Sequence, residues 1–147
     1  MAAACAAKSP SSLPPSPQPP ASVGAADCQH LAANATVNLR VPAESLTVFG
    51  TLSAYTKAAE SANSVTCQFC PNCGTQLFAQ SAARPQWRVI RAGNLDEPSS
   101  IKPSMNIWAD SAPAWACIDP SLDRVAKQPV PPAQVDGQPG TGLSKAR

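Results

Sequence analysis

The chain has 147 residues, about the length of one domain, and its 11 basic and 9 acidic side chains leave a net charge of only +2. So small a charge supports no binding of nucleic acid or of an acidic membrane, and no apolar run approaches the roughly 18–20 residues of a membrane-spanning helix. Alanine accounts for 27 residues, so the hydrophobic core must be small.

Composition divides the chain into three parts. Residues 1–26 are rich in Ala, Pro and Ser, lack aromatic residues and bury too little apolar surface to offset chain entropy, so we expect a disordered arm. All aromatic residues fall in residues 27–125, which we predict to be the folded domain. Residues 126–147, rich in Pro and Gly, are expected to form a disordered tail.

The N-terminus lacks the features of a targeting segment. Met1 to Ala7 is too short and too weakly apolar for a secretory signal, and the first Arg is Arg40. We therefore expect a cytoplasmic protein.

Period-two alternation dominates residues 27–125. Val37, Leu39 and Val41 alternate with polar residues until Pro42, as in a half-buried strand. One short helix is expected at 27–35, with Asp27 as its N-cap. Short strands separated by turn residues favour a mainly β fold over alternating β–α–β units. The further predicted strands are 46–49, 52–56, 64–69, 75–80, 87–92 and 105–109.

Three of the six cysteines, Cys67, Cys70 and Cys73, are clustered in the chain. Cys70-Pro71-Asn72-Cys73-Gly74 is typical of a zinc knuckle, in which a tight turn aims two thiolates at one point. A disulfide scaffold is less favoured because no signal peptide precedes the cluster, and a redox Cys-x-x-Cys normally opens a helix within a β–α–β unit. We predict that Cys70 and Cys73 bind zinc.

A structural zinc site needs four ligands, and the knuckle supplies two. Cys67 is better explained as a half-buried thiol in a strand, and His30, the only His, as a surface or packed residue. Cys5 lies in the predicted arm, and Cys117 is expected to be a small buried apolar residue.

Other polar and aromatic residues carry weaker signals. Arg84, Arg88 and Arg91 are placed to approach an anionic substrate such as glutathione, although solvated strand positions explain them more simply. Trp108 and Trp115 are expected to pack against the sheet.

The order of motifs resembles that of the glutathione-dependent formaldehyde-activating enzyme family, which includes centromere protein V. The resemblance covers about residues 27–120, and its most specific elements are the Phe-Cys-x-x-Cys-Gly knuckle and a Gly-x-Leu-Asp turn about twenty residues later. The motifs are Asp27-Cys28-Gln29, Asn38-Leu39-Arg40-Val41-Pro42, Phe49-Gly50, Phe69-Cys70-Pro71-Asn72-Cys73-Gly74-Thr75, Ala92-Gly93-Asn94-Leu95-Asp96, Ile107-Trp108 and Pro113-Ala114-Trp115.

The resemblance implies a Mss4-like (β-tent) fold with two zinc ions and carbon–sulfur lyase activity on thiol adducts of glutathione. Cys70 and Cys73 match the ligands of the structural zinc. Cys28 matches the last Cys of a Cys-x-Cys-x-x-Cys group that holds the catalytic zinc. The ligand set implied for this chain is thus Cys28, Cys70 and Cys73, with a glutathione conjugate as the small-molecule partner.

This sequence departs from the family pattern at the other ligands. Counting back from Cys28, the remaining catalytic ligands should stand at positions 23 and 25, which are Val23 and Ala25. The upstream structural Cys-x-Cys is also missing. One thiolate cannot hold a catalytic zinc, and two exposed thiolates bind it weakly.

Three interpretations follow. The chain is a family member that is incomplete at its N-terminus and whose lyase activity is impaired by the missing ligands. Alternatively, it is a non-catalytic zinc-knuckle β module that acts in protein–protein interaction, including self-association into a homo-oligomer. A zinc-free, marginally stable remnant is the third. We favour the first.

Overall fold

The computed structural model describes residues 7–8 and 18–129. Within these ranges the chain forms ten β-strands, one α-helix and four short 3-10 helices. The strands are β1 (Ala7–Lys8), β2 (Ala21–Val23), β3 (Thr36–Pro42), β4 (Thr47–Val48), β5 (Ser53–Ala58), β6 (Ser64–Phe69), β7 (Gln76–Ser81), β8 (Trp87–Arg91), β9 (Met105–Ile107) and β10 (Asp123–Val125). The helices are α1 (Ala26–Ala32), η1 (Ala43–Ser45), η2 (Ala92–Asn94), η3 (Pro98–Ser100) and η4 (Ala109–Ser111).

Eight of the strands form one mixed sheet. Its order is β10-β9-β2-β3-β8-β7-β6-β5, and β1 pairs with β4 in a separate two-stranded ladder. β9 runs parallel to both β2 and β10, whereas the other pairs in the sheet are antiparallel. The prediction of a mainly β fold is confirmed. The Mss4-like arrangement stays a prediction.

The periodic segments form strands close to the expected positions. The strand predicted at 64–69 has the bounds of β6, and the Val37–Val41 alternation lies within β3. The helix is shorter than expected because Ala33 adopts a left-handed conformation that ends it. Its N-cap is Ala25 and not Asp27. Asp27 lies in the first turn, where its carboxylate interacts favourably with the helix dipole.

The folded region begins before residue 27. β2 lies within the segment expected to be a disordered arm, but all three of its residues are buried. β3 pairs with one side of β2 and β9 with the other, so its backbone groups are satisfied by long-range partners. A strand of three residues has too little alternation to be recognised. The assignments of residues 1–6, 9–17 and 130–147 as disordered lie outside the described residues.

Two small apolar clusters form the core. Val41, Leu77, Phe78 and Ile90 pack between β3, β7 and β8. The second cluster lies at the other end of the sheet and includes Cys28 on α1; its other buried members are Ala21, Val23 and Ile107. Each cluster has only four buried members, so the core is small, as the alanine content led us to expect.

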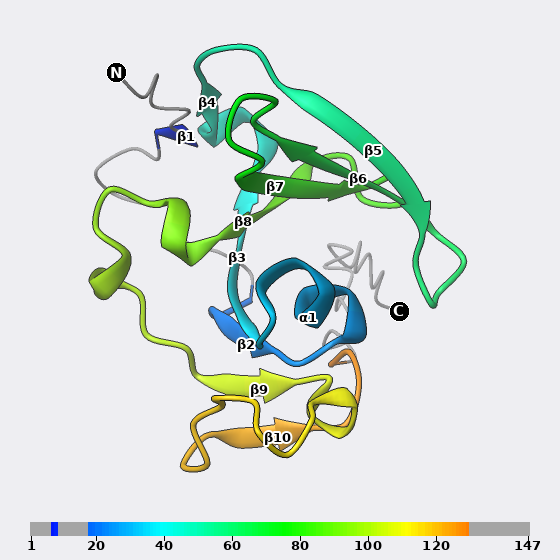
Figure 1. The fold of residues 1–147 in the computed structure, drawn as a ribbon, viewed down its shortest axis with the longest axis vertical. Helices are drawn as coiled ribbons and strands as arrows, with labels where there is room; N and C mark the ends of the chain where they lie inside the picture. The colour runs from blue at the N-terminus through cyan, green and yellow to red at the C-terminus, as the bar shows by residue number, and fades with distance from the viewer. Residues whose placement is uncertain (1–6, 9–17, 130–147) are drawn as a thin grey trace, which may run out of the picture.

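The sheet bends so that α1 lies in the concavity between its two ends. Figure 1 shows β5 to β8 above the helix, β2, β9 and β10 below it, and β3 connecting the two halves. α1 spans seven residues, and no helix in the described part of the chain is long and apolar enough to cross a membrane. The concave side therefore brings a helix, a sheet face and several turns close together.

Candidate functional site

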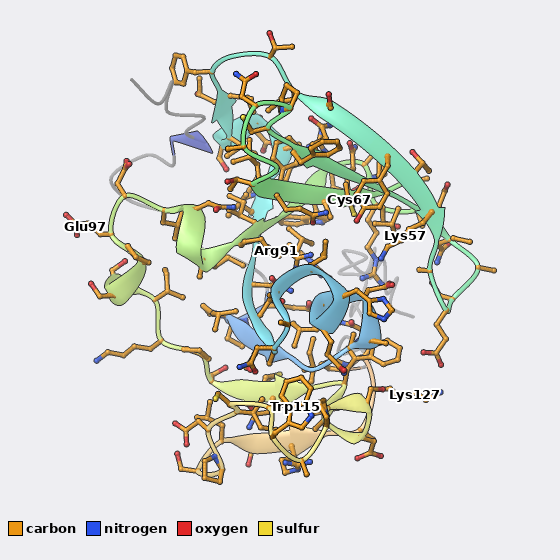
Figure 2. All side chains as sticks on the ribbon, viewed as in Figure 1. Lys57, Cys67, Arg91, Glu97, Trp115 and Lys127 are labelled. Carbon is orange, nitrogen blue, oxygen red and sulfur yellow. The ribbon has the colours of Figure 1, made fainter. Side chains whose placement is uncertain are left out.

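The strand register places cationic side chains on the concave face. Arg40 and Asn38 are two residues apart on β3, and Asn38 pairs directly with Arg91 on β8. Because alternate residues of a strand and directly paired residues share a face, Arg40 and Arg91 point to the same side. Figure 2 shows Arg91 and, at the far edge of the sheet, Lys57 on the side of α1.

A cleft of about 900 Å³ opens between this face and α1. Its walls also include the β5–β6 turn, the β7–β8 turn, Trp108 before η4, and Lys127 with Gln128 after β10. A cavity of this size is ample for a ligand of several hundred daltons.

Cys28 lines the cleft. Its side chain is buried, with a residue exposure of 6%. The guanidinium of Arg91 donates from Nη1 to Cys28 Sγ at 3.8 Å, to Thr36 Oγ1 at 3.3 Å and to Asn38 Oδ1 at 2.6 Å. The two β3 side chains therefore hold Arg91 against Cys28, the one thiol among the described residues that lines the cleft.

The turn before α1 fixes the position of Cys28. Gly24 N–H donates to Ile107 O at 3.0 Å, and Gln29 Nε2 donates to Gly24 O at 2.8 Å and to Ser111 O at 2.6 Å. A Cβ at Gly24 would lie 2.8 Å from Ala112 Cβ, closer than real Cβ atoms approach. Glycine is needed here because η4 and its flanking residues pack directly on the turn.

The fold brings together the three positions that the resemblance assigns to the catalytic zinc. Val23 and Cys28 belong to one buried cluster, and Ala25 packs against it. These positions hold one thiol and two aliphatic side chains, and an aliphatic side chain cannot ligate a metal. The three positions lie close together in the fold, but only Cys28 carries a side chain that could bind a metal.

The cleft is cationic. Among the described residues, five basic and two acidic side chains line it. Lys57 Nζ pairs with Asp27 Oδ2 at 2.6 Å, and Lys127 Nζ pairs with Glu60 Oε1 at 2.8 Å. The hydrogen bond and charge of Glu60 raise the pKa of Lys127. The remaining cations of the cleft, Arg40, Arg84 and Arg91, have no carboxylate partner among the described residues.

Trp108 forms a strained part of the wall. Its backbone is left-handed, with φ 54°, which is costly for a bulky side chain. The segment after β10 holds it there: Trp108 N donates to Lys127 O at 3.2 Å, and Nε1 donates to Gln128 Oε1 at 3.3 Å. Trp115, by contrast, is 64% exposed, so the prediction that it packs against the sheet is wrong.

The Cys70–Cys73 segment forms a tight turn between β6 and β7. Cys70 N–H donates to Thr75 O at 2.9 Å, and Gly74 N–H donates to Cys70 O at 2.9 Å. Gly74 has φ 73°, a conformation that favours glycine. Cys70 is fully buried, whereas Cys73 is exposed and its Sγ donates to Thr75 Oγ1 at 3.1 Å. The knuckle turn is present, but its two thiols are not equally exposed.

The described residues do not fit a zinc ion. They contain no group of three or more His, Cys, Asp or Glu side chains placed to hold a metal. Cys28 lines the cleft, whereas Cys73 lines a separate depression. Zinc needs three or four protein ligands, and neither place offers that many among the described residues. Zinc binding by these residues stays a prediction.

The separate depression lies beside the knuckle and has a volume of about 440 Å³. Its walls include Leu31 of α1 and an aromatic pair, Tyr55 and Phe69, whose ring centroids are 6.3 Å apart. Gln76 Nε2 donates to the Tyr55 hydroxyl at 2.9 Å. Burial, and to a smaller extent the neighbouring Cys67, raises the pKa of Tyr55.

The other predicted residues are distributed as follows. Arg84 lines the cleft, but Arg88 lies 5.9 Å from the Phe78 ring and does not line it. His30 is exposed. Cys117 is also exposed, so its predicted burial is wrong; it follows β9 in an irregular segment. Cys5 lies outside the described residues.

The sequence analysis missed the role of Arg40. It occupies a polar position in the 37–41 alternation, so the pattern placed it on the face opposite the core. The pattern did not reveal that this face lines a cleft, because that depends on α1 and on turns distant in sequence. Lys57 and Trp108 also line the cleft, and the sequence did not reveal this for the same reason.

The comparisons with known proteins identify a family. The family model described as glutathione-dependent formaldehyde-activating enzyme matches residues 17–111, which include β2, Cys28, the knuckle and Trp108. No curated protein sequence matches the chain. The matched residues make up more than half of the sequence, and the family is defined by glutathione-related, formaldehyde-activating activity. The chain therefore belongs to the glutathione-dependent formaldehyde-activating enzyme family.

Proposed function

We propose that this chain binds a small thiol adduct, such as a glutathione conjugate, in the cleft above Cys28. We further propose that its carbon–sulfur lyase activity is impaired. The observation that carries this proposal is the cationic cleft, in which Cys28 is the one thiol among the described lining residues and lies beside Arg91.

The charges of the cleft complement such a ligand. Glutathione is an anion at neutral pH and carries carboxylates at both ends, with its sulfur between them. Arg91 lies beside Cys28, so a carboxylate or the substituted sulfur of the ligand would meet a positive charge close to the protein thiol. Charge-assisted hydrogen bonds of this kind are stronger than those between neutral groups.

The impairment follows from the side chains at positions 23 and 25. The chain presents Val23 and Ala25 where two thiolates are implied, so the catalytic ligand set cannot form from this triad. Cys28 and Arg91 remain able to position a ligand. Binding without turnover is the expected behaviour.

The test combines a binding titration with an activity assay. Glutathione premixed with formaldehyde is titrated into the full chain by calorimetry, and the adduct is followed by NMR over hours. We expect saturable binding, weakening by about tenfold in Arg91→Gln, and no turnover above the protein-free rate. The control is Lys102→Gln, which removes an exposed charge that does not line the cleft. Absence of binding would refute the proposed ligand, and enzyme-dependent turnover would refute the impairment.

A second function is favoured by the depression beside the knuckle. Leu31, Tyr55 and Phe69 place apolar surface at the edge of the sheet, next to β5, which pairs with β6 alone among the described strands. An exposed edge and an apolar surface are features of protein–protein interaction. In this alternative the chain is a non-catalytic module that associates with another copy, which would supply the ligands that a zinc ion at Cys70 and Cys73 still lacks.

Measurement of mass in solution separates the two proposals. A zinc-dependent dimer that dissociates in Cys73→Ser, but not in Cys117→Ser, would favour the interaction module. Both of these cysteines are exposed, so the pair is matched. A monomer at all concentrations would refute it.

A further inference from the structure

The β7–β8 turn brings two arginines to the outer part of the cleft. Arg40 on β3 is two residues from Pro42, which pairs with Trp87 at the start of β8. Trp87 N in turn donates to Arg84 O at 3.1 Å. Arg84 is therefore held close to the end of β3 that carries Arg40, and both side chains line the cleft.

The turn that carries Arg84 is fixed by hydrogen bonds. Arg84 N donates to Ser81 O at 3.0 Å, and Gln80 Nε2 donates to Pro85 O at 3.0 Å. Ala43 N donates to Gln86 O at 2.9 Å and ties the turn to the residue after β3. A ligand group that binds between the two arginines would meet a backbone that is already ordered, which lowers the entropic cost of binding.

The two guanidiniums are not neutralised by the described residues. Neither side chain has a hydrogen bond or an ion pair there, although Arg40 is half-buried. Burial and, next in size, the positive charge of Arg84 lower the pKa of Arg40. Like charges and desolvation make this pair unfavourable by itself, and a shared anion would remove both costs.

We propose that Arg40 and Arg84 form an oxyanion subsite, which takes a carboxylate or phosphate group of the ligand. Guanidinium groups suit this role because their donors form a planar fork that matches both oxyanions. The subsite extends the proposed function and rests on it in one respect, which is that the sulfur end of the same ligand would lie at Cys28. The cleft therefore selects thiol compounds that carry a terminal oxyanion.

Inorganic phosphate tests the subsite independently of any thiol. It is titrated into the full chain by calorimetry, in a chloride buffer of constant ionic strength, with Arg40→Gln, Arg84→Gln and Arg88→Gln in parallel. Arg88 is the matched control: its Nη1 donates to Pro85 O of the same turn at 2.9 Å, but its side chain lies by the Phe78 ring and does not line the cleft, so its variant also controls for the conformation of the turn. We expect saturable binding that weakens about tenfold or more in the first two variants and less than about twofold in the control.

Arg84 is exposed, so its variant folds and its effect reports on binding. Absence of saturable phosphate binding, or equal weakening in Arg88→Gln, would overturn the subsite. Titration with glutathione and with its monoethyl ester, which lacks the glycine carboxylate, identifies the source of the oxyanion. Glutathione that binds equally to wild type and Arg84→Gln leaves the proposed function intact but refutes the subsite. Phosphate that binds at the arginines without competition from glutathione supports the subsite and refutes the proposed ligand.

Discussion

The cleft and the knuckle are two regions that the family pattern equips with zinc, and they differ from that pattern in opposite ways. Around Cys28 the fold brings all three ligand positions together, but two of them are Val23 and Ala25. In the knuckle both Cys70 and Cys73 are present, but no further metal-binding side chains accompany them among the described residues. One region has three ligand positions close together with a single thiol among them, and the other has two cysteines without further ligands among the described residues.

The difference indicates what maintains each region. The cleft positions are held by backbone contacts of Gly24 and by Gln29, which do not depend on a metal. The knuckle turn is held by backbone hydrogen bonds between Cys70, Gly74 and Thr75. Both turns are therefore stable as packed structure, and neither needs zinc to explain its conformation.

The largest change should come from restoring the cleft ligands. In the double variant Val23→Cys/Ala25→Cys we expect one Co²⁺ per chain with intense thiolate-to-metal absorption, because three converging thiolates are enough for a metal with one open position. Wild type and Cys117→Ser should show no such band. A double variant that folds but binds no cobalt would show that the three positions do not converge.

The packing that supports the cleft should be sensitive to one added methyl group. Gly24→Ala would force its Cβ into Ala112 and the Trp108 carbonyl, so we expect a loss of about 1–3 kcal/mol in the free energy of unfolding. Gly93→Ala is the control because nothing lies within 4 Å of its Cβ; its change should stay within about 0.5 kcal/mol. Chemical denaturation measures both, and similar values for the two variants would contradict the close packing.

Substitution of the two knuckle cysteines should lower the free energy of unfolding by different amounts if these residues contribute by packing. Cys70→Ser places a hydroxyl in a fully buried position and should cost about 1–2 kcal/mol. Cys73→Ser changes an exposed side chain and should cost less than about 0.5 kcal/mol. Equal and large losses in zinc-containing buffer would instead indicate that both thiols hold a metal.

The smallest effect on stability is expected from the ion pair between Lys127 and Glu60. Lys127 and Glu60 are both exposed, so Lys127→Gln should shift the melting temperature by less than about 2 °C. The raised pKa of Lys127 means that the pair stabilises the fold below the ordinary lysine pKa of 10.5 and that this contribution is lost as pH rises through the higher folded value. A larger shift near neutral pH would show that residues 127–128 hold Trp108 in its position on the wall of the cleft.

The sequence predicted best those elements whose signals are local. The alternation in 37–41 and the pattern of 64–69 identified two strands of the sheet, and the Cys70-Pro71-Asn72-Cys73-Gly74 spacing indicated the tight turn of the knuckle. The family resemblance, and not the spacing alone, implied Cys28 as a ligand and the missing thiols at 23 and 25. Long-range pairing explains most of what was missed: β2 is recognisable only once β3 and β9 lie on either side.

The cleft itself depended on tertiary structure. Arg40 and Arg84 are more than forty residues apart, and only the pairing of β3 with β8 brings them to one end of the sheet. The partial burial of Trp108 and the exposure of Trp115 likewise follow from the path of the chain around η4 and not from residue type.

Zinc analysis of the purified chain tests most directly the central claim, that the residues around Cys28 do not form a complete zinc site. Zinc per chain is measured by elemental analysis after dialysis, for wild type, Cys28→Ser and Cys73→Ser. We predict no zinc that depends on Cys28, whether or not the knuckle retains some. One zinc per wild-type chain that is lost in Cys28→Ser would contradict the account, because a complete metal site would then exist at the cleft.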